Sequence, residues 1–162
     1  MFDRETEGRY MTQHTCSCSC GTVSYTVSGT PRFRIYCHCT ICQRFNDAAF
    51  ADVVVYDASS VGDPPEGSVV FDTYKPPPNV KRGKCSSCGD PALEVFEAPL
   101  FPKLRIVPAS MFASDTALPD SCAHIFYDKR IEDASDELPK HSGMIASQLS
   151  FGKYLFRKRK AG

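Results

Sequence analysis

Short stretches in which apolar and polar residues alternate recur along the chain, and each predicts a β-strand. Residues 22–27 (TVSYTV) and 32–36 (RFRIY) alternate with a period of two, which places one face of a strand in the core and the other in solvent. Residues 48–56 contain three consecutive valines and predict a strand that is buried more completely, and residues 68–74 predict another of this kind. Further strands are expected at residues 93–97, 103–107 and 122–127.

Proline-rich segments separate these strands. Residues 63–67 (DPPEG) have the composition of a turn, and the three prolines within residues 75–79 (KPPPN) provide no backbone donors for a sheet. No long stretch repeats its apolar residues every 3.6 positions. The pattern therefore predicts a single mainly β domain with short helical turns.

The two ends of the chain depart from this pattern. Residues 1–14 are polar and predict a flexible leader. Within residues 142–162 the apolar positions are spread so that a weakly amphipathic helix could pack on the domain, although Gly143 and Gly152 disfavour it. The basic residues 157–160 are typical of a solvated tail, with RNA binding or a nuclear import signal as alternatives.

The length and composition are those of one soluble globular domain. The 162 residues are 42% hydrophobic and 23% charged, which argues against a disordered or fibrous chain. Nineteen basic residues balance nineteen acidic ones, so the chain has no net positive charge to attract a nucleic acid. No apolar run approaches the roughly 18 residues of a membrane span, and the charged start lacks the apolar stretch of a secretion signal. We therefore expect a cytoplasmic protein that does not bind membranes, with a nuclear location as the alternative.

Nine cysteines are the unusual feature of the composition. Cytosolic thiols stay reduced, so this many cysteines in an intracellular chain indicate metal binding or catalysis rather than disulfides. Cys16 and Cys122 stand alone, and the other seven follow the patterns C-x-C, C-x-C-x-x-C and C-x-x-C. The three groups are Cys18 with Cys20; Cys37 with Cys39 and Cys42; and Cys85 with Cys88.

The spacing within these groups suits zinc. A C-x-x-C turn brings two sulfurs onto one short arc of backbone. Gly89 after Cys88 lets the chain fold back so that backbone amides point at the thiolates and help to keep them ionised. The two cysteines of a C-x-C pair point to the same side of a strand and can share one metal.

Seven grouped cysteines divide naturally into four and three. Four thiolates saturate a tetrahedral zinc, whereas three leave one position for water, an aldehyde oxygen or a substrate thiolate. Spacing alone does not decide which four belong together. One arrangement joins C-x-C with C-x-x-C and leaves C-x-C-x-x-C open, and the alternatives are one closed site with spare thiols or two closed sites. In the last case the eighth ligand would be His14, His38, His124 or Cys16.

The order of these motifs resembles that of the glutathione-dependent formaldehyde-activating enzyme family, which includes centromere protein V-like domains. Three spaced cysteine motifs in this order are specific, whereas the later landmarks would mean little alone. The segments that carry the resemblance are 18–25 (CSCGTVSY), 37–44 (CHCTICQR) and 84–89 (KCSSCG), with weaker landmarks at 124–126 (HIF) and 137–139 (ELP).

The resemblance implies a zinc-bound, mainly β fold known as a β-tent, in which two small sheets are held together by metal. It divides the chain into a leader (1–14), a zinc domain (15–141) and a C-terminal extension with a basic end (142–162). It also implies two zinc ions per chain, one structural and one catalytic. The structural ligands would be Cys18, Cys20, Cys85 and Cys88, and the catalytic zinc would be held by Cys37, Cys39 and Cys42.

The resemblance further implies a carbon-sulfur lyase that acts on glutathione adducts of formaldehyde or a related small aldehyde. This agrees with the residues, because a zinc with an open position can lower the pKa of a bound thiol or polarise a carbonyl. Arg44 is the first candidate to bind a glutathione carboxylate. His38 should point away from the metal, and His124 should be a core or rim histidine. Further candidate cations are Lys75, Arg82 and Lys84.

The chain also departs from the family pattern. Gln43 and Asp47 stand where many relatives have arginine and glycine, Tyr74 begins Tyr-Lys-Pro-Pro rather than Tyr-x-Ser-Ser, and the chain has no tryptophan. These differences bear on which aldehyde and thiol are used. Two other functions remain as alternatives: a non-catalytic zinc module that binds a protein or nucleic-acid partner, and a thiol or metal buffer in which Cys16 and Cys122 react with oxidants. A homo-oligomer is compatible with each function.

Overall fold

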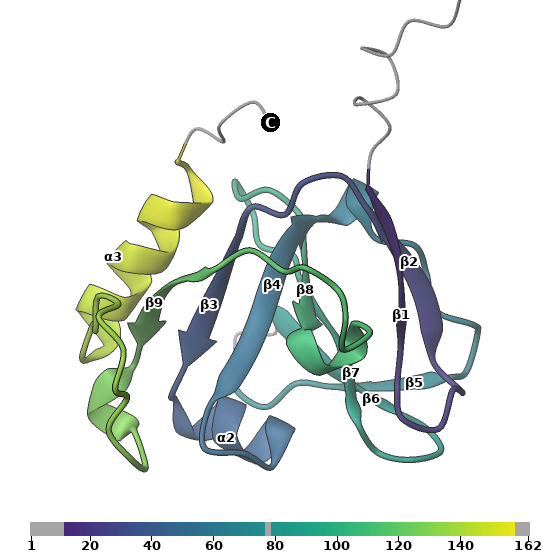
Figure 1. The fold of residues 1–162 in the computed structure, drawn as a ribbon, viewed down its shortest axis with the longest axis horizontal. Helices are drawn as coiled ribbons and strands as arrows, with labels where there is room; N and C mark the ends of the chain where they lie inside the picture. Colours follow the sequence, from purple (N-terminus) through teal and green to yellow (C-terminus); the bar gives the residue numbers. More distant parts are fainter. Residues whose placement is uncertain (1–11, 77–78, 158–162) are drawn as a thin grey trace, which may run out of the picture.

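The computed structural model describes residues 12–76 and 79–157, which fold mainly into β-strands (Figure 1). Most of the expected leader, two of the three consecutive prolines and the basic end beyond Arg157 lie outside the described residues. The strands are β1 (Gln13–Ser17), β2 (Ser24–Ser28), β3 (Phe33–Cys37), β4 (Ala51–Asp57), β5 (Val69–Asp72), β6 (Val80–Cys85), β7 (Pro91–Phe96), β8 (Leu104–Pro108) and β9 (Ser121–Ile125). The helices are α2 (Thr40–Asn46), α3 (Met144–Leu155) and short 3-10 turns at Ala58–Ser60, Ala109–Met111 and Tyr127–Lys129.

The strands form two sheets, which confirms the mainly β prediction. The larger sheet has seven strands in the order β5-β6-β7-β8-β4-β3-β9, and the smaller one is the antiparallel hairpin β1-β2. All neighbours in the larger sheet are antiparallel except β3 and β9. The hairpin lies at one side of the molecule and α3 at the other (Figure 1). No helix in the described part of the chain has the length and apolar character of a membrane span.

The larger sheet buries both of its faces. One core cluster joins the hairpin to this sheet, and Val54 and Tyr56 of β4 belong to it. The other cluster includes Val53 and Val55 and is covered in part by α3, whose Leu155 is almost completely buried. The alternation of valines between two cores confirms the prediction that this strand is buried on both sides.

The expected burial of residues 68–74 is wrong. β5 is shorter than predicted and lies at the edge of the larger sheet with β6 as its one neighbour, so Val70 is 61% exposed and Phe71 40% exposed. An apolar sequence alone did not reveal this, because it does not state how many neighbours a strand has.

Sequence patterning missed two strands. β1 begins at Gln13, inside the segment expected to be a leader, and β6 (VKRGKC) is too basic to show an apolar alternation. In β6, a Cβ on Gly83 would lie 2.4 Å from a Val69 methyl group and 2.9 Å from the Leu93 carbonyl oxygen. Only glycine therefore fits where β6 passes its neighbours.

Candidate metal centres

The four-cysteine group (Cys18, Cys20, Cys85 and Cys88) lies where the hairpin meets the larger sheet. The hairpin turn after β1 carries the first pair, and the second pair lies at the end of β6 and in the turn that follows. All four Sγ atoms lie within 4.8 Å of one another, and the Cys18 and Cys85 sulfurs are 3.6 Å apart. This donor set fits a tetrahedral metal ion with no position left open.

Backbone geometry prepares the second pair for a metal. Gly89 has a φ of +78° and donates its N–H to the Cys85 carbonyl, which closes the turn. The amides of Ser87 and Cys88 point at the Cys85 sulfur, each with an N···S distance of 3.4 Å. The hydrogen bond from the Cys88 amide is the main cause that lowers the pKa of Cys85, so this thiol is ready to bind as a thiolate.

The three-cysteine group (Cys37, Cys39 and Cys42) lies at one corner, where β3 ends and α2 begins. Cys39 caps the helix, and its sulfur accepts the Cys42 amide at 3.3 Å. The three Sγ atoms lie within 4.8 Å of one another, and no other histidine, cysteine or carboxylate of residues 12–76 and 79–157 joins them at that spacing. Neither Cys16 nor any of the candidate histidines therefore completes this group.

The thiols of this group need a cation if all three are to ionise. Hydrogen bonds from Cys37 and Cys42 lower the pKa of Cys39 to about 3, whereas those same contacts among the cysteines raise the pKa of Cys42. One sulfur can carry a negative charge only while its neighbours keep their protons. A soft divalent cation such as zinc removes this conflict, so the residues present fit a metal with three protein ligands.

A buried ion pair lies beside the three-cysteine group. Arg82 of β6 and Glu94 of β7 are opposite each other in the sheet, and Arg82 Nε lies 2.9 Å from Glu94 Oε1 without the alignment of a hydrogen bond. Burial raises the pKa of Glu94 to about 7. The guanidinium is within electrostatic reach of Cys39 and Cys42, where its positive charge offsets the negative charge of the thiolates.

Three of the four candidate cations gather near this corner, and we call them the basic cluster (Arg44, Arg82 and Lys84). The guanidinium carbons of Arg44 and Arg82 lie 5.8 and 5.9 Å from the centre of the Tyr74 ring. Lys84 Nζ lies 5.7 Å from the centre of the Phe45 ring, which itself contacts Tyr74. No hydrogen bond, ion pair or cation–ring contact in the described part of the chain joins Lys75 to this cluster.

Strand β6 separates the two cysteine groups. Because side chains alternate along a strand, Arg82 and Lys84 face the three-cysteine corner, whereas Cys85 faces the hairpin and the other group. This arrangement puts a charged environment on one face of the strand and a closed donor set on the other.

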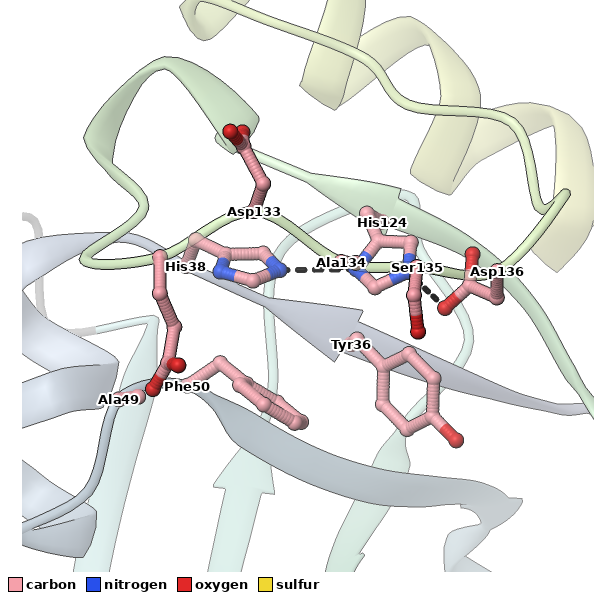
Figure 2. Close-up of a pocket in the computed structure, with 10 residues that line it drawn as sticks. Tyr36, His38, Ala49, Phe50, His124, Asp133, Ala134, Ser135 and Asp136 are labelled. Carbon is pink, nitrogen blue, oxygen red and sulfur yellow. Dashed lines mark hydrogen bonds and ion pairs between the residues drawn. The ribbon is translucent and has the colours of Figure 1, made fainter.

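His38 points away from the thiols on either side of it, as its place in the sequence predicts. Its Nε2 lies 2.8 Å from Nδ1 of His124, and Nε2 of His124 lies 2.8 Å from the Asp136 carboxylate (Figure 2). His124 is 2% exposed and is therefore a core histidine at the rim of a cavity. Sequence reasoning found neither this contact nor Asp136, because the two histidines are 86 residues apart and no motif marks the aspartate.

The two solitary cysteines do not have the properties of oxidant-sensitive thiols. Cys16 of β1 is completely buried in the core cluster that joins the hairpin to the larger sheet, and burial raises its pKa to about 12. Cys122 is partly buried, and burial raises its pKa to about 11. Both stay protonated near neutral pH, which argues against the thiol-buffer function.

A family model described as glutathione-dependent formaldehyde-activating enzyme matches residues 13–129. The chain belongs to this family. The match includes all seven grouped cysteines and connects the two cysteine groups with glutathione and formaldehyde chemistry. A comparison with curated proteins gave no match.

A solved structure shares the fold of this family member. It is the crystal structure of a Rhodobacter sphaeroides protein determined as a structural genomics target, which is 16% identical in sequence with a TM-score of 0.50. The similarity covers 63% of this chain and 90% of that one. At this level of identity the similarity concerns the fold alone.

Proposed function

We propose that this protein is a zinc-dependent carbon-sulfur lyase that acts on the glutathione adduct of formaldehyde or a related small aldehyde. The observation that carries the proposal is the difference between the two cysteine groups, because one offers four thiol ligands and the other three. A group of three leaves a coordination position for a substrate, whereas a group of four does not. Family membership supports the choice of thiol and aldehyde.

Cys37, Cys39 and Cys42 would hold the catalytic zinc, and Cys18, Cys20, Cys85 and Cys88 the structural one. When bound at the open group, zinc would supply a Lewis acid that favours a thiolate or polarises an aldehyde. In the forward direction a carbon-sulfur bond forms, the thiol loses its proton, and the former aldehyde oxygen gains one. The reverse reaction breaks the same bond and restores the thiol and the aldehyde.

The side chains around the corner would orient the substrate. Arg82 pairs with Glu94 and interacts electrostatically with Cys39 and Cys42, so its charge would limit the accumulation of negative charge when a substrate thiolate arrives. Arg44 and Lys84 lie farther out on the two aromatic rings and would bind the carboxylates of glutathione. Asp47 ends α2 with a φ of +47°, a conformation that glycine adopts more easily, so the fold tolerates this departure from the family pattern.

Proton NMR exchange spectroscopy of glutathione and formaldehyde tests this proposal. With the zinc-loaded protein we expect exchange faster than without protein, and Cys39→Ser should return it to the uncatalysed rate. The control is Cys122→Ser, which changes a cysteine outside both groups and should leave exchange unchanged. Equal rates with and without the zinc-loaded wild-type protein would contradict the proposal.

One observation favours a second function, the binding of a protein partner. Helix α3 packs its inner face on the domain, yet its outer face exposes Ile145 by 77% and Leu149 by 70%. Replacing both by lysine should abolish capture of a partner while leaving zinc content and exchange unchanged. If the double variant retains every partner that the wild-type protein captures, this face is not the binding surface.

A further inference from the structure

A cavity of about 410 Å³ lies on the side of His38 that faces away from the metal ligands. Four aromatic rings line it and contact one another in a closed circuit (Figure 2). The ring centres of Tyr36 and Phe50 are 5.3 Å apart, and those of Phe50 and His38 5.1 Å apart. The circuit closes through His124, whose ring centre lies 5.1 Å from that of His38 and 5.0 Å from that of Tyr36. None of the seven grouped cysteines lines this cavity.

The remaining wall is acidic. The loop of residues 132–136 closes the cavity and contributes three carboxylates, whereas no lysine or arginine lines it. Asp133 pairs with Arg130, and Asp136 pairs with Lys140, so these two charges are balanced from outside the cavity. Glu132 is exposed and makes no ion pair or hydrogen bond with any residue of the described ranges. The lining therefore keeps about one uncompensated negative charge.

The hydrogen bonds of the two histidines leave one buried nitrogen without a partner among the described residues. The hydrogen bond with His124 lowers the pKa of Asp136 to about 2, so the carboxylate is ionised and accepts the Nε2–H of His124. Nδ1 of His124 lies 2.8 Å from Nε2 of His38, so the two imidazoles and the carboxylate form one chain of hydrogen bonds. Nδ1 of His38 lies outside this chain. The ring is 2% exposed, and this nitrogen has no partner within the described residues.

We propose that this cavity is a binding site for a small organic cation, an aromatic or alkyl ammonium compound. Aromatic faces attract a cation over the ring, and carboxylates accept its N–H groups. The free Glu132 carboxylate supplies the matching charge, and the buried Nδ1 of His38 is a polar atom of the lining residues that has no partner of its own within the described residues. The volume is that of an ordinary small-molecule pocket and suits a compound the size of benzylamine.

The experiment compares three probes of nearly equal shape, which are benzylamine, benzyl alcohol and benzoate. Each is titrated into the zinc-loaded protein without aldehyde, and the imidazole C–H resonances of His38 and His124 are followed by NMR. We expect saturable shifts with benzylamine and none with the neutral or anionic probe. Equal shifts with benzyl alcohol, or no saturable shift with benzylamine, would overturn the proposal.

Two exposed glutamates provide matched variants. Glu132→Gln should weaken benzylamine binding by about 5- to 10-fold, because it removes a charged acceptor. Glu137→Gln changes a nearby exposed glutamate that does not line the cavity, and it should leave binding unchanged. Equal benzylamine affinities in the two variants would show that the cation does not contact Glu132. The binding assay contains neither glutathione nor formaldehyde, so its outcome is independent of the proposed lyase activity.

Discussion

The two cysteine groups use the same side chain but differ in how far apart their members lie in the sequence. The four-cysteine group joins Cys18 to Cys85 across 67 residues and connects the two sheets. The three-cysteine group lies within six consecutive residues at one strand–helix corner. A metal at the first group closes a long loop and links separate sheets, whereas a metal at the second constrains a corner that is already folded. This difference supports the proposal that a metal at the first group stabilises the fold and a metal at the second takes part in the chemistry.

The largest effect should come from losing one long-range ligand. Cys88→Ser should prevent cooperative folding, because a structural zinc supplies about 10–16 kcal/mol of apparent binding free energy. That amount is comparable with the whole stability of a domain, about 5–15 kcal/mol. Cys39→Ser should keep a cooperative thermal transition. Circular dichroism melts together with zinc content per chain would measure both, and an equal loss of structure in the two variants would break the comparison.

An intermediate effect is expected at the buried ion pair beside the three-cysteine corner. Arg82→Met should lower the free energy of unfolding by about 1–3 kcal/mol, because Glu94 would take up a proton and stay buried without its partner. The control is Arg105→Met, which breaks a pair with the half-exposed Glu97 and should cost at most about 1 kcal/mol.

The same pair of variants also reports on metal affinity. Urea unfolding gives the stabilities, and competition with a chelator dye gives the zinc affinity of each group. Arg82→Met should lower the zinc affinity of the three-cysteine group alone, which we expect to be the weaker of the two sites. A similar loss at both zinc ions would show that Arg82 acts on the fold as a whole rather than on the corner.

The smallest effect should appear at the outer part of the basic cluster. Arg44→Gln should raise KM for the glutathione adduct by about 2- to 5-fold with kcat unchanged, because an exposed ion pair contributes up to about 1 kcal/mol. Zinc content and melting temperature should not change. Lys153→Gln, at an exposed position of α3, is the matched control. A fall in kcat rather than a rise in KM would move Arg44 from substrate binding to the chemistry itself.

Local patterns predicted much of the fold. The alternation in residues 32–36 and the valines of residues 48–56 identified β3 and β4. A strand buried on one face alternates apolar and polar residues, and a strand buried on both faces is apolar throughout, so a short segment is enough to predict either. The edge position of β5 and the existence of β6 were missed, since both depend on which strands become neighbours. Strand β6 lies between the two cysteine groups, and its basic residues Arg82 and Lys84 face the three-cysteine group. No short segment of the sequence shows this position, because the two groups come from distant parts of the chain.

The sequence by itself determined the chemical repertoire: seven grouped cysteines, their spacing and their order, which are properties of neighbouring residues. Only the tertiary structure decided how they combine, because bringing Cys18 to Cys85 requires the hairpin to pack on the larger sheet. It also decided which cations gather in the basic cluster, and it paired His38 with His124 across 86 residues. Ligand spacing is set by covalent geometry over a few residues, whereas these contacts depend on topology and on the cores that hold the sheets together.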